Sequence, residues 1–437
     1  MPPSALTSPP TLTQAPTLAP LPDRLHALDA VRASALILGV ALHGAQPFIS
    51  GLPWMVQEAP STALAAAWFT IHLFRMPLFF LIGGFFGRMV LERRGVRGFI
   101  KDRSRRILVP LVVGVPTIML LTGLAYMAGG WIVGADARGL AAPPASARRN
   151  LLDSINLMHL WFLYYLLMFY VTVLGSRALI SAVTKRTSRP SSAPDRRPRL
   201  SAVLDRCVSV LVRSGSGPLL LALPAAAWYF RLRGWSPWGG LPAPFSLQPD
   251  VGAVLAYGSF FTFGWLLNRQ QSFLASLEQR WMVHGAVALA AWAICRVLAG
   301  ATPHWGPILS GLPLAAYTVC YVGSAWSGSF ALIGVALRFL PDLSPVRRYL
   351  AEASYWIYLL HIAVLLFFEQ ILHPLHWPAI LKYAVSIAGA MSVLLLSYHG
   401  LVRFTFIGEW LNGKGHRRVR GTDRPLQTVD DPSVRTR

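Results

Sequence analysis

The chain has 437 residues, of which 54% are hydrophobic and only 13% charged, and its formal net charge is +22. Soluble domains carry about 25% charged residues. Apolar runs of about 18 residues or more recur along the chain, so the composition excludes an ordinary soluble enzyme and indicates an all-α, polytopic membrane protein. Lys and Arg stand between the apolar runs, where they anchor a protein to the lipid bilayer, so we expect no nucleic-acid partner.

Residues 1–24 are rich in Pro, Ser and Thr and lack the apolar region of a signal peptide, which predicts a disordered N-terminal tail. We expect an integral-membrane domain over 25–414, with a flexible basic cytoplasmic linker at about 177–216. A basic cytoplasmic tail over 415–437 completes the predicted organisation. The three cysteines show neither a disulfide framework nor a metal spacing, so no metal site is expected.

Ten apolar segments follow one another along the chain and predict about ten transmembrane helices. The eighth segment, 307–340, is long enough for two short spans. We expect one long helix there, because two spans would place the basic tail on the outer side. The ten segments are 30–49, 64–90, 107–129, 155–175, 217–232, 251–268, 281–299, 307–340, 350–372 and 380–402.

Lys and Arg are distributed unevenly between the connections. The connection 88–106 holds eight and 177–213 holds nine, whereas 49–62, 300–306 and 373–379 hold none. Positively charged loops stay on the cytoplasmic side. This asymmetry predicts that both chain ends are cytoplasmic.

The first apolar segment carries Asp29, Arg32 and His43 on one stripe of its helix. A charge inside a membrane span costs several kcal/mol unless it faces a partner or a water-filled cavity. Asp29 and Arg32 are spaced to form an ion pair, and an oriented neutral imidazole is a good general base. The alternative is a structural ion pair with a histidine that is hydrogen-bonded to a neighbouring helix.

The second segment places His72 and Arg75 three residues apart in mid-span. Arginine cannot lose its proton in a protein. Arg75 must therefore meet a carboxylate, a phosphate or a cavity, and a buried carboxylate on another helix is the structural alternative.

Arg103 and Arg106 close the basic connection just before the third segment. Paired guanidinium groups suit phosphates because each can form a bidentate contact. The alternative is anchoring at the membrane surface, which basic clusters at this place provide whatever the function.

Two later segments carry further candidates. His159 and Trp161 open the fourth segment, where an aromatic belt alone would explain the tryptophan, and Tyr358 and His361 share a face of the ninth. No zinc spacing, phosphate-binding loop, nucleophile elbow or carboxylate pair is present, which argues against a metalloprotease, an ATPase and a serine esterase.

Five motifs in this order resemble the membrane acyltransferase 3 family, over residues 24–414. The likeness extends to a branch thought to succinylate periplasmic glucans. The motifs are Leu28-Asp29-x-x-Arg32 with His43, Phe74-Arg75-Met76-Pro77-Leu78-Phe79-Phe80, Arg103-x-x-Arg106, His159-Leu-Trp-Phe-Leu163 and Ser354-x-x-Ile357-Tyr358-Leu-x-His361.

The resemblance implies a bacterial inner-membrane enzyme without a bound cofactor. It implies a cytoplasmic acyl-CoA donor, with succinyl-CoA as a candidate, and a hydroxyl of an extracytoplasmic carbohydrate, such as a periplasmic glucan, as acceptor. The family's essential histidine falls on His43, its first-helix arginine on Arg32, and its Arg-x-x-Arg motif on Arg103 and Arg106. We expect His43, Asp29 and Arg32 to be catalytic. The expected substrate-binding residues are Arg75, His72, Arg103, Arg106, His159, Trp161, Tyr358 and His361.

Two points stay open at the level of sequence. His43 either takes the proton of the acceptor hydroxyl directly or carries the acyl group in a two-step route. A polytopic transporter with a polar pathway is the main alternative function, and a membrane glycosyltransferase with a lipid-linked donor is a second.

Overall fold

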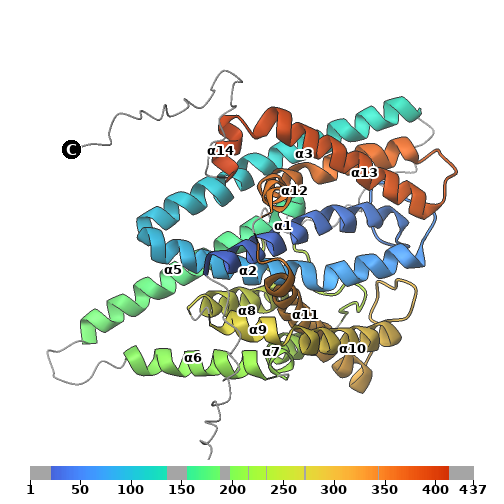
Figure 1. The fold of residues 1–437 in the computed structure, drawn as a ribbon. Helices are drawn as coiled ribbons and strands as arrows, with labels where there is room; N and C mark the ends of the chain where they lie inside the picture. The colour runs from blue at the N-terminus through green and yellow to red at the C-terminus, as the bar shows by residue number, and fades with distance from the viewer. Residues whose placement is uncertain are drawn as a thin grey trace, which may run out of the picture.

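The computed structural model describes most of the chain, and every regular element in the described residues is a helix (Figure 1). The predicted C-terminal tail and residues 1–20 of the predicted N-terminal tail lie outside the described residues. Described are residues 21–134, 155–187, 197–214, 216–232, 234–269, 272–342 and 344–412.

The helices keep the order of the predicted apolar segments. They are α1 (Leu21–Ala45), α2 (Thr62–Arg103), α3 (Val109–Val133), α5 (Trp161–Thr187), α6 (Arg197–Arg213), α7 (Gly217–Arg231), α8 (Val251–Leu267), α9 (Phe273–Gln279), α10 (Trp281–Ala299), α11 (Gly311–Phe339), α12 (Pro345–Leu372), α13 (Ala379–Ser397) and α14 (Phe406–Asn412). Short 3₁₀ helices occupy Gln46–Phe48 and Met158–Leu160, and π-helical turns occupy Ser104–Leu108 and Tyr398–Val402.

Each of the ten predicted segments overlaps one of these helices, and the long eighth segment holds the single helix α11. Among the described residues, seven helical segments are long and apolar enough to cross a membrane, or eight if the bent pair α6 and α7 is one span. In that count the run Thr62–Val133, which holds α2 and α3, is one segment, and α8 is too short to qualify. A total of ten spans stays a prediction.

The basic connection 88–106 is helical instead of a loop. α2 continues through it to Arg103 and is kinked at Gly95. The φ of 66° at Gly95 lies in the left-handed region that favours glycine. Arg, Lys and Glu are good helix formers, and the Arg88–Glu92 ion pair of 2.6 Å supports the helix surface. A π-helical turn, Ser104–Leu108, then leads directly into α3.

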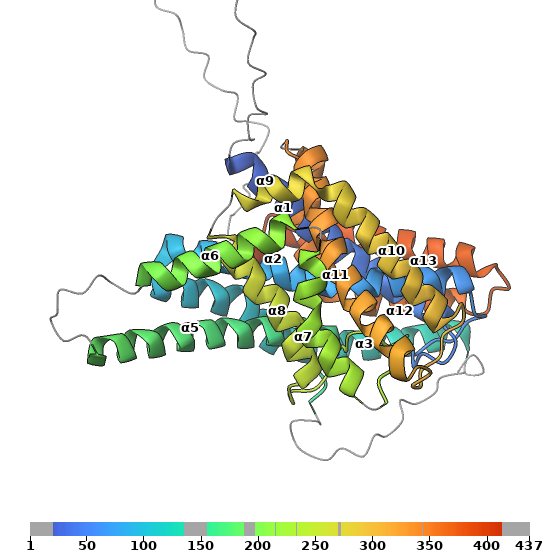
Figure 2. The ribbon, with the colours of Figure 1, turned by 90° about the horizontal axis from the view of Figure 1, so that it is seen from below.

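Most of the predicted linker 177–216 is also helical. α5 extends to Thr187 and projects beyond the other helices in both views, and α6 follows from Arg197 to Arg213 (Figures 1 and 2). α6 is amphipathic. It lacks a continuous apolar run, which explains why a search for apolar segments passes over it.

The helix α1 lies in the middle of the bundle and contacts α2, α11, α12 and α13 (Figure 1). α10 packs along α11 on one side of the bundle (Figure 2). At the end where α1 finishes, Glu58 accepts a 2.7 Å hydrogen bond from Lys382 and lies 3.1 Å from His373. This buried ion pair fixes the connection after α1 to α12 and α13.

The crossing of α2 and α8 depends on two glycines. A Cβ atom at Gly84 would collide with the backbone carbonyl of Phe261, and one at Gly264 would collide with the carbonyl of Leu81. Small residues let helix backbones approach this closely in membrane proteins. The pair therefore sets the distance between the two helices.

We expect Gly264→Ala to destabilise the folded protein by about 1–3 kcal/mol, because the clash is with backbone, which cannot rotate away. Thermal unfolding in detergent measures the effect. The control is Gly123→Ala in α3, where an added Cβ has open space and alanine favours a helix. Equal melting temperatures for the two variants would show that the crossing tolerates a methyl group.

Candidate functional site

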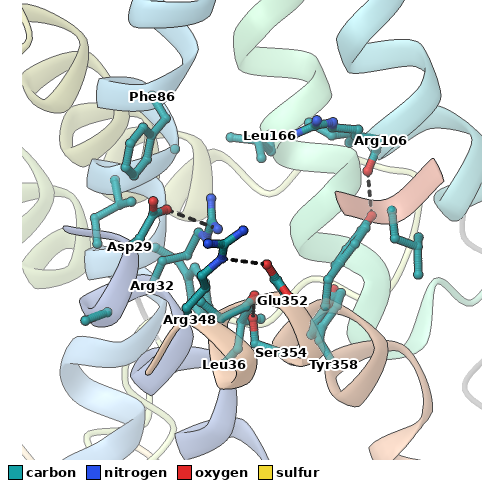
Figure 3. A pocket seen from close by; sticks show the side chains of 18 of the residues that line it. Asp29, Arg32, Leu36, Phe86, Arg106, Leu166, Arg348, Glu352, Ser354 and Tyr358 are labelled. Carbon is teal, nitrogen blue, oxygen red and sulfur yellow. Dashed lines mark hydrogen bonds and ion pairs between the residues drawn. The ribbon is translucent and has the colours of Figure 1, made fainter. Parts of the chain in front are cut away.

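A cavity of about 490 Å³ opens at the end of the bundle where α1, α3 and α12 begin and α2 ends. Arginine side chains come to it from four elements, and Figure 3 shows three of them, Arg32, Arg106 and Arg348. Its volume lies in the range of about 300–1,000 Å³ that is typical of ligand pockets. The charged lining consists of Arg32, Arg103, Arg106, Arg347 and Arg348 against Asp29, Asp342 and Glu352. The cationic excess makes the mouth a site for an anion.

Arg103 and Arg106, the two arginines of the predicted motif, both line the cavity. Both also contact the buried carboxylate of Asp102, at 3.6 and 3.5 Å, and Arg94 reaches the same carboxylate at 2.9 Å. One carboxylate thus faces three guanidinium groups. Arg103 is further held over the rings of Phe99 and Tyr170. The cluster is fixed by protein contacts and still keeps a positive excess.

Asp29 and Arg32 form the ion pair that their spacing predicts, with 3.1 Å between Oδ1 and Nη2. Both line the cavity, and their side chains are 41% and 42% exposed. The pair therefore lies at the accessible mouth and not next to His43, which is three helical turns away along α1.

Arg347 and Arg348 belong to the same cavity and are missed by the sequence analysis. They lie in the first turn of α12, which Ser344 caps through the backbone N–H of Arg347. Arg348 pairs with Glu352 at 3.1 Å, and Arg347 donates to the carbonyl oxygen of Asp342. The Ser-Pro helix start followed by two arginines was the available signal.

Tyr358 connects this cavity to the histidines. Its side chain lines the inner part of the cavity, and its hydroxyl donates to the carbonyl oxygen of His159 at 2.9 Å. In turn, the Tyr358 carbonyl oxygen lies 2.9 Å from His159 Nε2 and 2.7 Å from His361 Nδ1. Since a carbonyl oxygen only accepts, both imidazoles donate to it and each keeps a lone pair on its other nitrogen.

Three of the predicted histidines converge from three helical elements. The ring centroids of His43 and His361 are 5.1 Å apart, those of His159 and His361 are 4.9 Å apart, and those of His43 and His159 are 6.5 Å apart. In the described part of the chain, no group of three or more His, Cys, Asp or Glu side chains is arranged to hold a metal ion.

His43 is oriented by two neighbours. Its Nδ1 donates to Gln46 Oε1 at 2.8 Å, which leaves the lone pair on Nε2, and its ring stacks on Trp54. Trp54 is itself fixed, because its Nε1–H donates to the buried carboxylate of Glu369 at 2.8 Å. An imidazole that is held in one tautomer by a second group has the arrangement of a general base. Neither Gln46 nor Trp54 stood out in the sequence.

The remaining predicted site residues, Arg75, His72 and Trp161, lie in different surroundings. The Arg75 guanidinium lies against α1 at Gly39. His72 stacks on Trp68 and has its Nδ1 3.4 Å from the Tyr321 hydroxyl. Trp161 is buried against the rings of Phe80 and Tyr257, and its part in substrate binding stays a prediction.

Comparison with known proteins shows what the chain is similar to. Glucans biosynthesis protein C of Escherichia coli strain SMS-3-5 is 31% identical over 151 residues, which cover 34% of this chain and 37% of that protein. Its counterpart in Salmonella paratyphi A, strain ATCC 9150, is 29% identical over 183 residues, or 41% of this chain and 46% of that protein.

The matched part of this chain thus spans less than half the length of these curated relatives. No solved structure matches the chain. The model of the acyltransferase 3 family, described as an acyltransferase domain, matches residues 25–399. The chain therefore belongs to the acyltransferase 3 family, and its candidate membrane-spanning helices indicate a multi-pass membrane protein.

Proposed function

We propose that the protein is an inner-membrane O-acyltransferase that moves an acyl group from cytoplasmic acyl-CoA to a hydroxyl of an extracytoplasmic carbohydrate. One observation carries the proposal: Tyr358 joins an arginine-lined cavity to His159 and His361, and the ring of His43 lies beside those two histidines. Acyl transfer from CoA needs both an anion-binding mouth and a base near the reacting carbon.

The donor end of the bundle is the end with the cavity. The phosphates of acyl-CoA would contact Arg103 and Arg106, assisted by Arg32, Arg347 and Arg348, with the thioester directed inward toward Tyr358. Paired guanidinium groups recognise phosphate oxygens in a bidentate way. Lys and Arg concentrate at this end, so the proposal includes ten spans with both chain ends in the cytoplasm.

His43 is the base in this proposal. Its Nε2 takes the proton of the acceptor hydroxyl while the hydroxyl oxygen bonds to the thioester carbon. The C–S bond then breaks, and the imidazolium returns the proton to the CoA thiolate, so the reaction needs no external acid. The route is a direct transfer without an acyl-histidine.

A glucan is the acceptor that the relatives' name, glucans biosynthesis protein C, supports. A succinyl group is the candidate acyl group. Radiolabelled succinyl-CoA and acetyl-CoA, supplied to membranes with and without the protein, test the proposal directly. Label in a polysaccharide fraction is expected only with the protein, and a transporter would leave no covalent label.

The topology prediction concerns both basic ends of the protein. Reporter fusions after residues 195 and 425 should both report the cytoplasm, because Lys and Arg cluster in these regions. Alkaline phosphatase and green fluorescent protein serve as complementary reporters, with a fusion after residue 303 as the outer-side control. Phosphatase activity of the 425 fusion would contradict an even number of spans.

The donor prediction compares arginines of equal charge. Arg103→Ala or Arg106→Ala should raise the Kd of acyl-CoA about 10-fold to 100-fold, as expected for losing a charge-assisted hydrogen bond of about 1.5–3 kcal/mol. Arg93→Ala and Arg97→Ala are the controls, because both residues are exposed outside the cavity. Equilibrium binding in detergent measures all four. Equal small changes in Kd for all four variants would show that Arg103 and Arg106 only anchor the protein to the membrane.

The base prediction concerns His43→Gln, which keeps hydrogen-bonding atoms but loses basicity. The rate of acyl transfer should fall about 10²-fold to 10⁴-fold, with the melting temperature little changed. His284→Gln is the matched control, because His284 is a fully buried histidine beside Phe330 and outside the site. Near-normal turnover of His43→Gln would leave His43 as a structural hydrogen-bonding residue.

A further inference from the structure

The guanidinium of Arg75 lies between the cavity and the base. Along α1, Leu36 lines the cavity, Gly39 follows one turn later, and His43 follows after one more turn. Arg75 comes from α2 and its Nη1 packs against α1 at Gly39. The charge is therefore held about one helical turn, or roughly 5.4 Å along the axis, from the residue proposed as base.

Gly39 makes this placement possible. A Cβ atom at residue 39 would collide with Arg75 Nη1, and the glycine itself is buried. A larger residue at this position would displace the Arg75 guanidinium from its contact with α1. The position of the charge thus depends on the absence of one methyl group on α1.

Arg75 has no counter-ion among the residues that the structure describes. The ion pairs found there leave it out, and its buried Nε has no hydrogen-bond partner. Its electrostatic neighbours are histidines and tyrosines, namely His43, His72, His159, His361, Tyr257 and Tyr358. A permanent charge without a carboxylate in an apolar bundle is costly, and charges kept inside membrane proteins usually mark a functional site.

We propose that Arg75 stabilises the oxyanion of the tetrahedral intermediate, and that Gly39 is the positioning residue that holds its guanidinium in place. The inference rests on the proposed acyl transfer. When the acceptor oxygen attacks the thioester carbon, the two electrons of the C=O π bond move to the carbonyl oxygen, which becomes negative. That electron pair re-forms the π bond when the C–S bond breaks and CoA leaves as a thiolate.

A fixed cation beside this oxygen lowers the barrier, because the charge it stabilises exists only in the transition state and the intermediate. The arginines at the mouth, which the proposed function assigns to the phosphates, are partly neutralised by Asp29, Asp102 and Glu352. Arg75 lacks such a partner and is nearer to the base, so it is the group available to the reacting carbon.

The first test separates oxyanion stabilisation from recognition of a free carboxylate on the acyl chain. Arg75→Gln and Arg75→Lys are assayed with acetyl-CoA and succinyl-CoA and a glucan oligosaccharide. We expect kcat to fall about 10²-fold to 10³-fold for Arg75→Gln with both donors, with the Kd of each donor within about threefold of the wild type. Arg75→Lys keeps the positive charge but loses the paired N–H donors of the guanidinium, and it should retain part of the activity.

The second test uses Gly39→Ala with Gly44→Ala as control. Gly44 is on the same helix, and its added Cβ would meet the flexible Ile387 side chain at 2.6 Å. Gly39→Ala should lower kcat as Arg75→Gln does, and should have no further effect in an Arg75→Ala background, where the methyl group has space. The effect of Gly44→Ala should stay the same in both backgrounds.

Two outcomes would overturn the inference. A loss confined to succinyl-CoA, or seen only in Kd, would make Arg75 a carboxylate-binding residue. Additive effects of Gly39→Ala and Arg75→Ala would show that the glycine acts on helix packing alone. The wild-type protein is assayed first, so that the two failures are distinguished: no acyl transfer by the wild type contradicts the proposed function, whereas wild-type transfer that Arg75→Gln leaves unchanged contradicts the role of Arg75.

Discussion

Ionisable side chains inside an apolar helical bundle need partners, because the lipid and the helices around them offer no water to solvate a charge. The structure meets this constraint in two ways. Asp102 neutralises part of an arginine cluster, and Glu58 pairs with Lys382 at the opposite end. The histidines between these ends instead donate to a carbonyl or amide oxygen. Arg75 departs from both patterns, which is why its surroundings carry the most information about the chemistry.

The helix α12 connects the two ends of the site. Near its start, the Tyr355 hydroxyl donates to the carbonyl oxygen of Arg106 at 2.6 Å, which fixes α12 to the π-helical turn after α2. Three residues later, Tyr358 contacts His159 through both its hydroxyl and its carbonyl oxygen. π-Helical turns occur often at functional sites. A shift of α12 would therefore move the wall of the donor cavity and the histidines together.

The sequence predicts the helices well because long apolar runs in a membrane protein have almost no alternative to a helix. It also predicts the Asp29–Arg32 pair, since residues three apart share a helix face. The convergence of His43, His159 and His361 could not be derived, because it depends on how three helices cross. The same holds for Gly39 and for Trp54, whose partners Arg75 and Glu369 are distant in the sequence. The role of Trp161 cannot be derived from the sequence either, since a tryptophan at the start of a span fits an aromatic belt, a binding site and a packed core equally well.

The arrangement also bears on how an acyl group crosses a membrane without a transport cycle. The cavity opens at the end where α1 begins, whereas His43 lies in the last turn of α1, next to the connection that carries Trp54. Under the proposed function, CoA stays at the first end and the carbohydrate at the second, and only the acyl carbon comes near both. A transporter must expose one site alternately to the two sides. An enzyme whose substrates approach one reaction centre from opposite ends has no such need, so a bundle fixed by close helix crossings such as Gly84–Gly264 is compatible with catalysis.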